Sequence, residues 1–134
     1  MKLVVDTGVF SAALSRRRRA DLEHHVRLLA GNQIFLAAST VVELRYGALV
    51  AEWGSPRRSR LEQAIASTTV IPVSDGLLTT LATVRFECRN AGHPLADRVH
   101  ANDLWIAASA IHLGIALVTA DGVFAGVPRL IVID

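Results

Sequence analysis

Short apolar runs alternate with longer amphipathic segments along this chain. Between the apolar runs, polar and charged residues separate apolar ones at helical spacing, as at Leu22, Val26 and Leu29. Uninterrupted apolar strands that alternate with helices are typical of a parallel sheet with both faces covered. The pattern therefore predicts an α/β fold. Its strands are expected at residues 3–5, 34–36, 70–73, 115–118 and 130–133.

Turn and cap residues divide the predicted helices. Ser39 or Thr40 is expected to cap the helix after the second strand, Ser74 or Asp75 the fifth helix, and Asn102 the last one. Pro72 in the third strand favours an edge position, because proline cannot donate a hydrogen bond to a neighbouring strand. No linker or repeat interrupts the chain, so residues 1–134 are expected to form a single domain. The helices are predicted at residues 9–14, 20–30, 40–51, 56–66, 75–90 and 103–112.

Composition narrows the class of protein. The chain has 134 residues, of which 51% are hydrophobic and 19% charged, so it can bury a core. A single cysteine, Cys88, excludes an intramolecular disulfide and a cysteine-based zinc site. Arginines gather at Arg16–Arg19 and again at Arg57, Arg58 and Arg60. Such clusters can bind the phosphates of a nucleic acid, or they can simply keep the surface soluble.

Two segments resemble targeting or membrane sequences. The apolar start of the chain is similar to a signal peptide, but Asp6 lies in the middle of the run that would have to be hydrophobic. Residues 104–120 carry no formal charge, yet they include His112 and Gly114 and fit a helix followed by a strand better than a membrane span. We therefore expect a cytoplasmic protein with no membrane segment.

Four acidic residues fall at the same edge of the predicted sheet. Asp6 directly follows the first strand, and Asp121 follows the fourth. Glu43 lies one turn into the helix after the second strand, and Asp103 lies in the first turn of the helix that leads into the fourth. In parallel α/β sheets, sites form beyond the carboxyl ends of the strands. The topology therefore predicts that four separate segments bring these acids together.

A cluster of four carboxylates needs a cation, because the like charges would otherwise repel one another. Oxygen ligands suit a hard divalent ion such as Mg²⁺, or Mn²⁺ in its place. An ion of this kind activates water and stabilises charge on a phosphoryl group, which implies phosphodiester hydrolysis. The five histidines include no His-x-x-x-His pair that would indicate zinc instead.

Each acid could also have a purely structural role. Asp6 can cap the next helix, Glu43 can form a capping box with Thr40, Asp103 suits a helix N-terminus, and Asp121 precedes a glycine in a turn. The four together favour a metal site over coincidence.

Other polar residues lie near the predicted site in the sequence. Thr7 and Thr119 can hydrogen-bond a ligand or an acid, and Asp97 is expected to be solvated. The sequence identifies no partner for three histidines, His93, His100 and His112.

Four segments carry a resemblance to a known family. They are Leu3 to Gly8, Ser39 to Leu44 with Gly47, Asn102 to Ala108, and Leu117 to Asp121 with Phe124. In order and separation these segments resemble the PIN-domain ribonucleases, in particular the VapC toxins of bacterial toxin–antitoxin pairs. The resemblance covers essentially the whole chain, and the third segment followed by the fourth is its most specific part.

The resemblance implies a fold, an activity and partners. The fold is a three-layer α/β/α PIN-like domain with a central, mostly parallel sheet of four to five strands. The activity is endonucleolytic cleavage of RNA that depends on Mg²⁺, for which Mn²⁺ can substitute. The implied partners are a cognate VapB-type antitoxin and a second copy of the chain in a homodimer. The family's acidic positions fall on Asp6, Glu43, Asp103 and Asp121, with Asp6 and Asp103 contacting the metal most directly.

Three rival functions fit parts of the sequence. Asp6-Thr7-Gly8 is the triplet of aspartic proteases, but those are rich in β-structure and helical spacing dominates here. A phosphatase of the haloacid-dehalogenase type needs a second acid where Gly8 stands. A PIN-like module that binds RNA or protein without cutting is opposed by the full set of acids.

The arginine run Arg16–Arg19 is not part of the family pattern. We hypothesise that it binds the RNA backbone or packs against an acidic stretch of the antitoxin.

Overall fold

Five strands and six α-helices alternate in the part of the chain that the computed structural model describes, residues 1–17 and 20–134. The strands are β1 (Lys2–Val5), β2 (Gln33–Leu36), β3 (Thr69–Val70), β4 (Ala116–Val118) and β5 (Val132–Ile133). The helices are α1 (Thr7–Leu14), α2 (Glu23–Arg27), α3 (Ala38–Val50), α4 (Ser55–Ala66), α5 (Asp75–Asn90) and α6 (Ala101–Leu113). Four 3₁₀ turns complete them: η1 (Ala20–Leu22), η2 (Pro94–Ala96), η3 (Arg98–His100) and η4 (Gly122–Phe124).

The strands form one parallel sheet in the order β3-β2-β1-β4-β5. The predicted α/β fold is therefore confirmed. Strand β3 lies at an edge, as Pro72 indicates, but it ends at Val70, before the proline. The N–H of Ile71 still donates to the carbonyl of Leu36, at 2.9 Å, so pairing continues up to the residue that lacks a donor.

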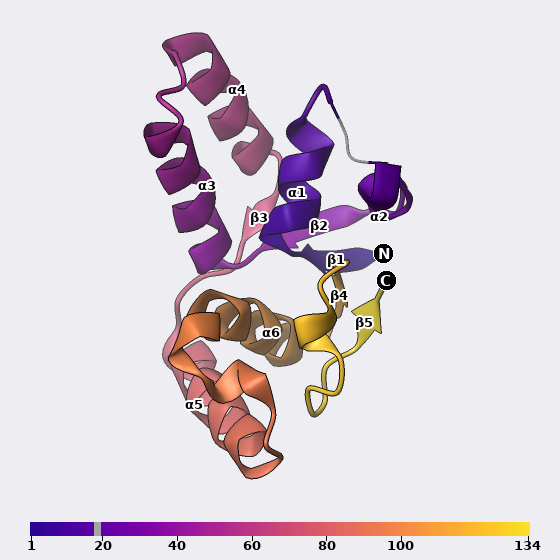
Figure 1. The fold of residues 1–134 in the computed structure, drawn as a ribbon, viewed down its shortest axis with the longest axis vertical. Helices are drawn as coiled ribbons and strands as arrows, with labels where there is room; N and C mark the ends of the chain where they lie inside the picture. The colour runs from indigo at the N-terminus through magenta and orange to yellow at the C-terminus, as the bar shows by residue number, and fades with distance from the viewer. Residues whose placement is uncertain (18–19) are drawn as a thin grey trace.

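Side chains of the central strand alternate between two hydrophobic cores. Leu3 and Val5 of β1 pack in the core with α1, α3 and α4, while Val4 packs in the core with α5 and α6. Figure 1 shows the resulting three layers, with α1, α3 and α4 on one face of the sheet and α5 and α6 on the other. Because both faces of the central strand are buried, Leu3, Val4 and Val5 are all apolar rather than alternating with polar residues.

The segment at residues 20–30 differs from the single helix that its spacing predicts. It forms η1 and then the five-residue helix α2, after which backbone N–H groups bond three residues back, as from Leu29 to Val26. Gly31 then takes a positive φ of 76°. The helix stops early because the chain must reverse within a few residues to enter β2.

Two predicted helix caps are wrong, and one is confirmed. Helix α3 begins at Ala38, before Ser39 or Thr40, and α6 begins at Ala101, before Asn102. The N-cap positions fall on Ala37, whose side chain has no acceptor, and on His100, and neither makes a side-chain capping hydrogen bond. Ser74, by contrast, does cap α5, where its hydroxyl accepts from the N–H of Leu77 at 3.1 Å.

The uncharged stretch at residues 104–120 forms most of α6 and then β4, as expected. In the described part of the chain, no helix combines the length and the hydropathy that a membrane span requires.

Candidate active site

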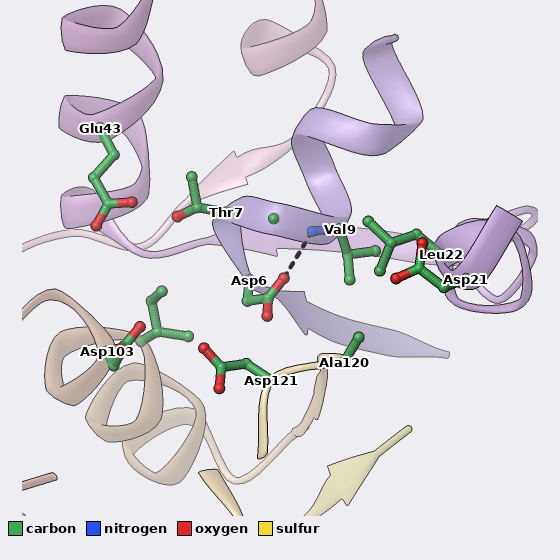
Figure 2. Close-up of a pocket in the computed structure, with 11 residues that line it drawn as sticks. Asp6, Thr7, Val9, Asp21, Leu22, Glu43, Asp103, Ala120 and Asp121 are labelled. Atoms are coloured by element: carbon green, nitrogen blue, oxygen red, sulfur yellow. Dashed lines mark hydrogen bonds between the residues drawn. The ribbon is translucent and has the colours of Figure 1, made fainter. Parts of the chain in front are cut away.

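The predicted site lies at the carboxyl edge of the sheet, where β1 and β4 end side by side. The N–H of Asp6 donates to the carbonyl of Val118 at 3.2 Å, which ties the two strand ends together. An open pocket of about 340 Å³ begins here, and all four predicted acids line it. Figure 2 shows their side chains around one pocket, reaching it from the residue after β1, from α3, from α6 and from the loop after β4. Neighbouring strands whose connections leave in opposite directions create such a crevice.

Asp6 is the buried acid of the set. Only 7% of its surface is exposed. One carboxylate oxygen accepts from the N–H of Val9 at 2.8 Å and so caps α1, while the other accepts from the hydroxyl of Thr119. The capping role and the site role therefore coexist, because a carboxylate has enough lone pairs to accept both bonds and still face the pocket.

Thr119 connects two of the acids. Its buried hydroxyl donates to Asp6 and accepts from the backbone N–H of Asp121 at 3.0 Å. Asp121 in turn accepts from the N–H of Val123 at 2.9 Å, which caps η4. The expectation that Thr119 can hydrogen-bond an acid is confirmed. The end of β4 thus positions Asp121 through the backbone and leaves its carboxylate exposed at the pocket.

Glu43 enters the pocket from α3. The predicted capping box with Thr40 does not form, because Thr40 lies inside the helix and its hydroxyl accepts from that of Thr7 at 3.1 Å. Figure 2 shows the Glu43 side chain extending from α3 toward the pocket. The Glu43 side chain is half-buried, and it does not cap the N-terminus of its own helix.

Asp103 enters the pocket from the first turn of α6, as the antiparallel direction of this helix predicts. Its carboxylate oxygen Oδ2 lies 3.3 Å from Nδ1 of His100. About 30% of each of these two side chains is exposed. The helix dipole also favours an acid at this end, so the structural and the functional role of Asp103 are compatible.

Burial and mutual repulsion disfavour charge on two of the acids. Burial raises the pKa of Asp6, and the nearby charge of Asp121 adds to that effect. Hydrogen bonds from Thr119 and Val9, and the charge of His25, oppose it. The pKa of Asp103 is also raised, first by burial and then by the charges of Asp121 and Asp6, against the hydrogen bond from His100. Cations at this pocket would therefore relieve a real electrostatic cost.

The donor set fits a hydrated divalent cation. Within residues 1–17 and 20–134, no three acidic, histidine or cysteine side chains stand close enough together to hold a metal ion unaided. Mg²⁺ commonly keeps several waters and is bound through only one or two carboxylates. Asp6 and Asp103 can supply such contacts, and Glu43 and Asp121 can bind the waters around the ion.

Some residues near the site were not predicted from the sequence. Asp21 and Leu22 of η1 also line the pocket, but their segment has the spacing of an ordinary amphipathic helix. His100 has a partner that the sequence did not identify, although its spacing of three residues from Asp103 places the two on one helix face. Asp97 is exposed and is not among the residues that line the pocket, as expected.

The arginine run is only partly described. Arg16 and Arg17 are exposed between α1 and η1, beside the segment that lines one side of the pocket. Arg18 and Arg19, which belong to the same predicted contact, lie outside the described residues.

Replacing Thr119 with valine should weaken both the fold and the site. The change keeps the shape of the side chain but leaves a buried Asp6 oxygen and the N–H of Asp121 without their partner. We expect the free energy of unfolding to fall by about 1–3 kcal/mol in urea titrations. Thr119→Ser keeps the hydroxyl and serves as the control. No destabilisation by Thr119→Val, or a smaller one than by Thr119→Ser, would show that the methyl group matters more than the hydrogen bonds.

Comparisons with known proteins agree with this geometry. The model of the PIN domain family matches residues 3–130. The chain therefore belongs to the PIN domain family. It is 32% identical over 124 residues to ribonuclease VapC5 of Mycobacterium tuberculosis, a match that covers 91% of this chain and 84% of the relative. Within the family it is thus of the VapC ribonuclease type.

Solved structures show the same fold. The structure of VapBC2 from Rickettsia felis, bound to a DNA fragment from its promoter, superposes with a TM-score of 0.79 at 25% identity, covering 99% of this chain and 98% of that one. VapBC-5 from Mycobacterium tuberculosis, a member of the VapBC family of toxin–antitoxin systems, superposes with a TM-score of 0.66 at 28% identity. That match covers 98% of this chain and 97% of the other. The predicted three-layer PIN-like fold is confirmed.

Proposed function

We propose that residues 1–134 form one PIN domain that acts as a Mg²⁺-dependent endoribonuclease, the toxin of a toxin–antitoxin pair. The observation that carries the proposal is the convergence of Asp6, Glu43, Asp103 and Asp121 from four separate segments on one pocket. The relation to a VapC ribonuclease supports RNA as the substrate. When bound, Mg²⁺ or Mn²⁺ supplies charge stabilisation for the phosphoryl group and lowers the pKa of water.

The side chains of the pocket would have different tasks. Asp6 and Asp103 would hold the cation, since both are carboxylates whose charge the fold alone disfavours. The more exposed Asp121 and the half-buried Glu43 would orient water and keep it on one side of the scissile phosphate. The pocket is open, so an RNA strand can pass across it rather than enter it end first. That arrangement supports cleavage at internal positions of the RNA strand.

The proposal includes protein partners. The similar structures named above are of VapBC pairs, and VapBC-5 belongs to a family of toxin–antitoxin systems. We therefore propose a VapB-type antitoxin as the inhibitor of this chain. A homodimer is proposed as well, on the family resemblance.

Sequencing of RNA ends tests the proposal. Brief induction of the protein in a bacterial host should arrest growth and create new RNA 5′ ends at a restricted set of positions. The purified protein should create the same ends in an RNA pool. Co-expression of the antitoxin should abolish both effects. Binding of RNA without new ends would instead support a PIN-like module that does not cut.

The arginine run gives a separate prediction. Replacing Arg16–Arg19 with alanine should leave the fold intact and weaken RNA binding, with a shallower dependence on salt. Removing one phosphate contact to single-stranded RNA should lower the slope of log K against log salt by roughly 0.7. Filter binding between about 50 and 200 mM salt measures this slope. Alanine at Arg57, Arg58 and Arg60 tests whether the loss of the second arginine cluster lowers the slope to the same extent, and equal slopes for wild type and the Arg16–Arg19 variant would refute the contact.

A further inference from the structure

His100 makes a contact with the site that the predicted acid set does not include. It is the last residue of η3 and precedes α6, and its Nδ1 lies 3.3 Å from Oδ2 of Asp103. The charged form of Asp103 can only accept hydrogen bonds, so Nδ1–H of His100 is the donor to the ionised carboxylate. Because the two residues are three positions apart at a helix start, the contact is geometrically easy.

Helix capping does not account for this histidine. His100 occupies the N-cap position of α6, where serine, threonine, aspartate or asparagine would bond a free backbone N–H. Its side chain makes no such bond. The imidazole is turned to Asp103 instead, and the ring is half-buried rather than free in solvent. His100 therefore acts on the Asp103 carboxylate rather than on the backbone of α6.

Among the described residues, the orientation of the Asp103 carboxylate depends on a single hydrogen bond, whereas that of Asp6 depends on two. Two hydrogen bonds, from Val9 and Thr119, fix both oxygens of Asp6. For Asp103, the described part of the chain provides one side-chain hydrogen bond, the one from His100 to Oδ2. The other oxygen, Oδ1, is thereby left available to a ligand in the pocket.

Electrostatics would otherwise turn Asp103 away. Burial raises the pKa of Asp103, and the nearby charges of Asp121 and Asp6 add to that effect. A side chain about 30% exposed can relieve both costs by rotating toward water. A hydrogen bond from His100, which is not among the residues that line the pocket, opposes this rotation. A donor of this kind orients a metal-binding carboxylate before the ion arrives.

We propose that His100 is a positioning residue, whose Nδ1–H holds the Asp103 carboxylate toward the pocket and thereby strengthens the binding of a divalent cation. This inference rests on the proposed function, because it assumes that Asp103 binds the cation. The inference adds His100 to the site. This residue is not one of the four acids, and it sets the orientation of Asp103 before the ion binds.

Two substitutions separate the hydrogen bond of His100 from its packing. His100→Asn keeps a side-chain N–H close to the position of Nδ1 and removes the ring. His100→Phe keeps a ring and removes the donor. We expect His100→Phe to weaken Mn²⁺ binding by about 10-fold or more, as the removal of such supporting groups does. His100→Asn should bind Mn²⁺ within a few-fold of wild type. Isothermal titration calorimetry with Mn²⁺ alone measures both.

Cleavage kinetics give the second measurement. With His100→Phe, the rate at low Mn²⁺ should fall, saturating Mn²⁺ should restore kcat, and KM for RNA should not change. His112→Phe is the matched control, because it makes the same change at the histidine of α6, whose contact is with Thr80 on α5. Circular dichroism and urea unfolding check that each variant is folded.

Three outcomes would overturn the inference. Wild-type Mn²⁺ affinity in His100→Phe would show that the contact is not needed. Equally weakened binding in His100→Phe and His100→Asn would show that ring packing, or the imidazole itself as a ligand, matters instead. A fall in kcat that saturating Mn²⁺ does not restore would indicate a direct role in the chemistry. Failure of the proposed function is distinct, since then wild type and Asp103→Asn would bind Mn²⁺ equally poorly.

Discussion

Replacing Asp6 with asparagine is expected to lower the rate of RNA cleavage by roughly 10²–10³-fold, the effect typical of removing one group that stabilises charge in a transition state. The asparagine oxygen can still accept from the N–H of Val9 and cap α1. Because burial already raises the pKa of Asp6, a neutral side chain should cost the fold little. Activity and stability should therefore separate in this variant. Cleavage of an RNA pool with Mg²⁺, and urea unfolding, measure the two.

Asp97→Asn is the matched control for Asp6→Asn. Asp97 is an exposed aspartate that does not line the pocket, so its substitution should leave cleavage unchanged. EDTA should lower wild-type cleavage to the level of Asp6→Asn, and restored Mg²⁺ should rescue wild type alone. If wild type, Asp6→Asn and the EDTA-treated protein gave equal products, the metal site would be refuted.

Mg²⁺ is expected to stabilise the folded protein at neutral pH but not in acid. The folded-state pKa values of Asp6 and Asp103 are raised above their ordinary values. Without metal, their contribution to stability is therefore fully present below the unfolded-state pKa and is lost as the pH rises through the folded-state pKa. A cation that binds the charged carboxylates should return this stability. At a tenfold excess over its Kd, Mg²⁺ should add about 1.4 kcal/mol, or about 5 °C in Tm.

Urea unfolding between about pH 4 and pH 8, with and without Mg²⁺, measures this linkage. The double variant Asp6→Asn/Asp103→Asn separates these two groups from all other titrating residues. It should lack both the decrease in stability on raising the pH and the recovery with Mg²⁺. NaCl at equal ionic strength controls for general screening. Equal stabilisation by Mg²⁺ in wild type and in the double variant would place the ion elsewhere.

Local sequence patterns predicted most of the fold. Apolar runs such as Leu3-Val4-Val5 identify strands buried on both faces, and β1 is indeed shared between the two cores. The wrong predictions concern helix starts, one helix length and the bounds of the two edge strands, β3 and β5. The residue type and spacing of Thr40 suit a cap, yet its hydroxyl is taken by Thr7, which lies 33 positions earlier in the chain. No local pattern could reveal that partner.

The residues of the site also include some that the sequence predicted and some that it did not. The sequence predicted that Asp6, Glu43, Asp103 and Asp121 lie at one edge, because parallel strands end together, and the four do line one pocket. Asp21 was missed, because it reaches the pocket only through the turn that replaces a predicted helix. The roles of the four acids in catalysis and metal binding stay predictions.

By itself, the sequence determined the parallel sheet, the edge at which chemistry could occur and the acids that reach it. Periodicity and residue type are local properties, and strand direction follows from their alternation. Only the tertiary structure decided how Asp6 is held, because its partner Thr119 lies 113 positions away. It also decided that burial disfavours charge on Asp6 and Asp103. The physical reason is that a hydrogen-bond partner and a burial cost depend on which distant segments meet. The raised pKa values that make a cation useful at this pocket therefore arise only in the folded chain.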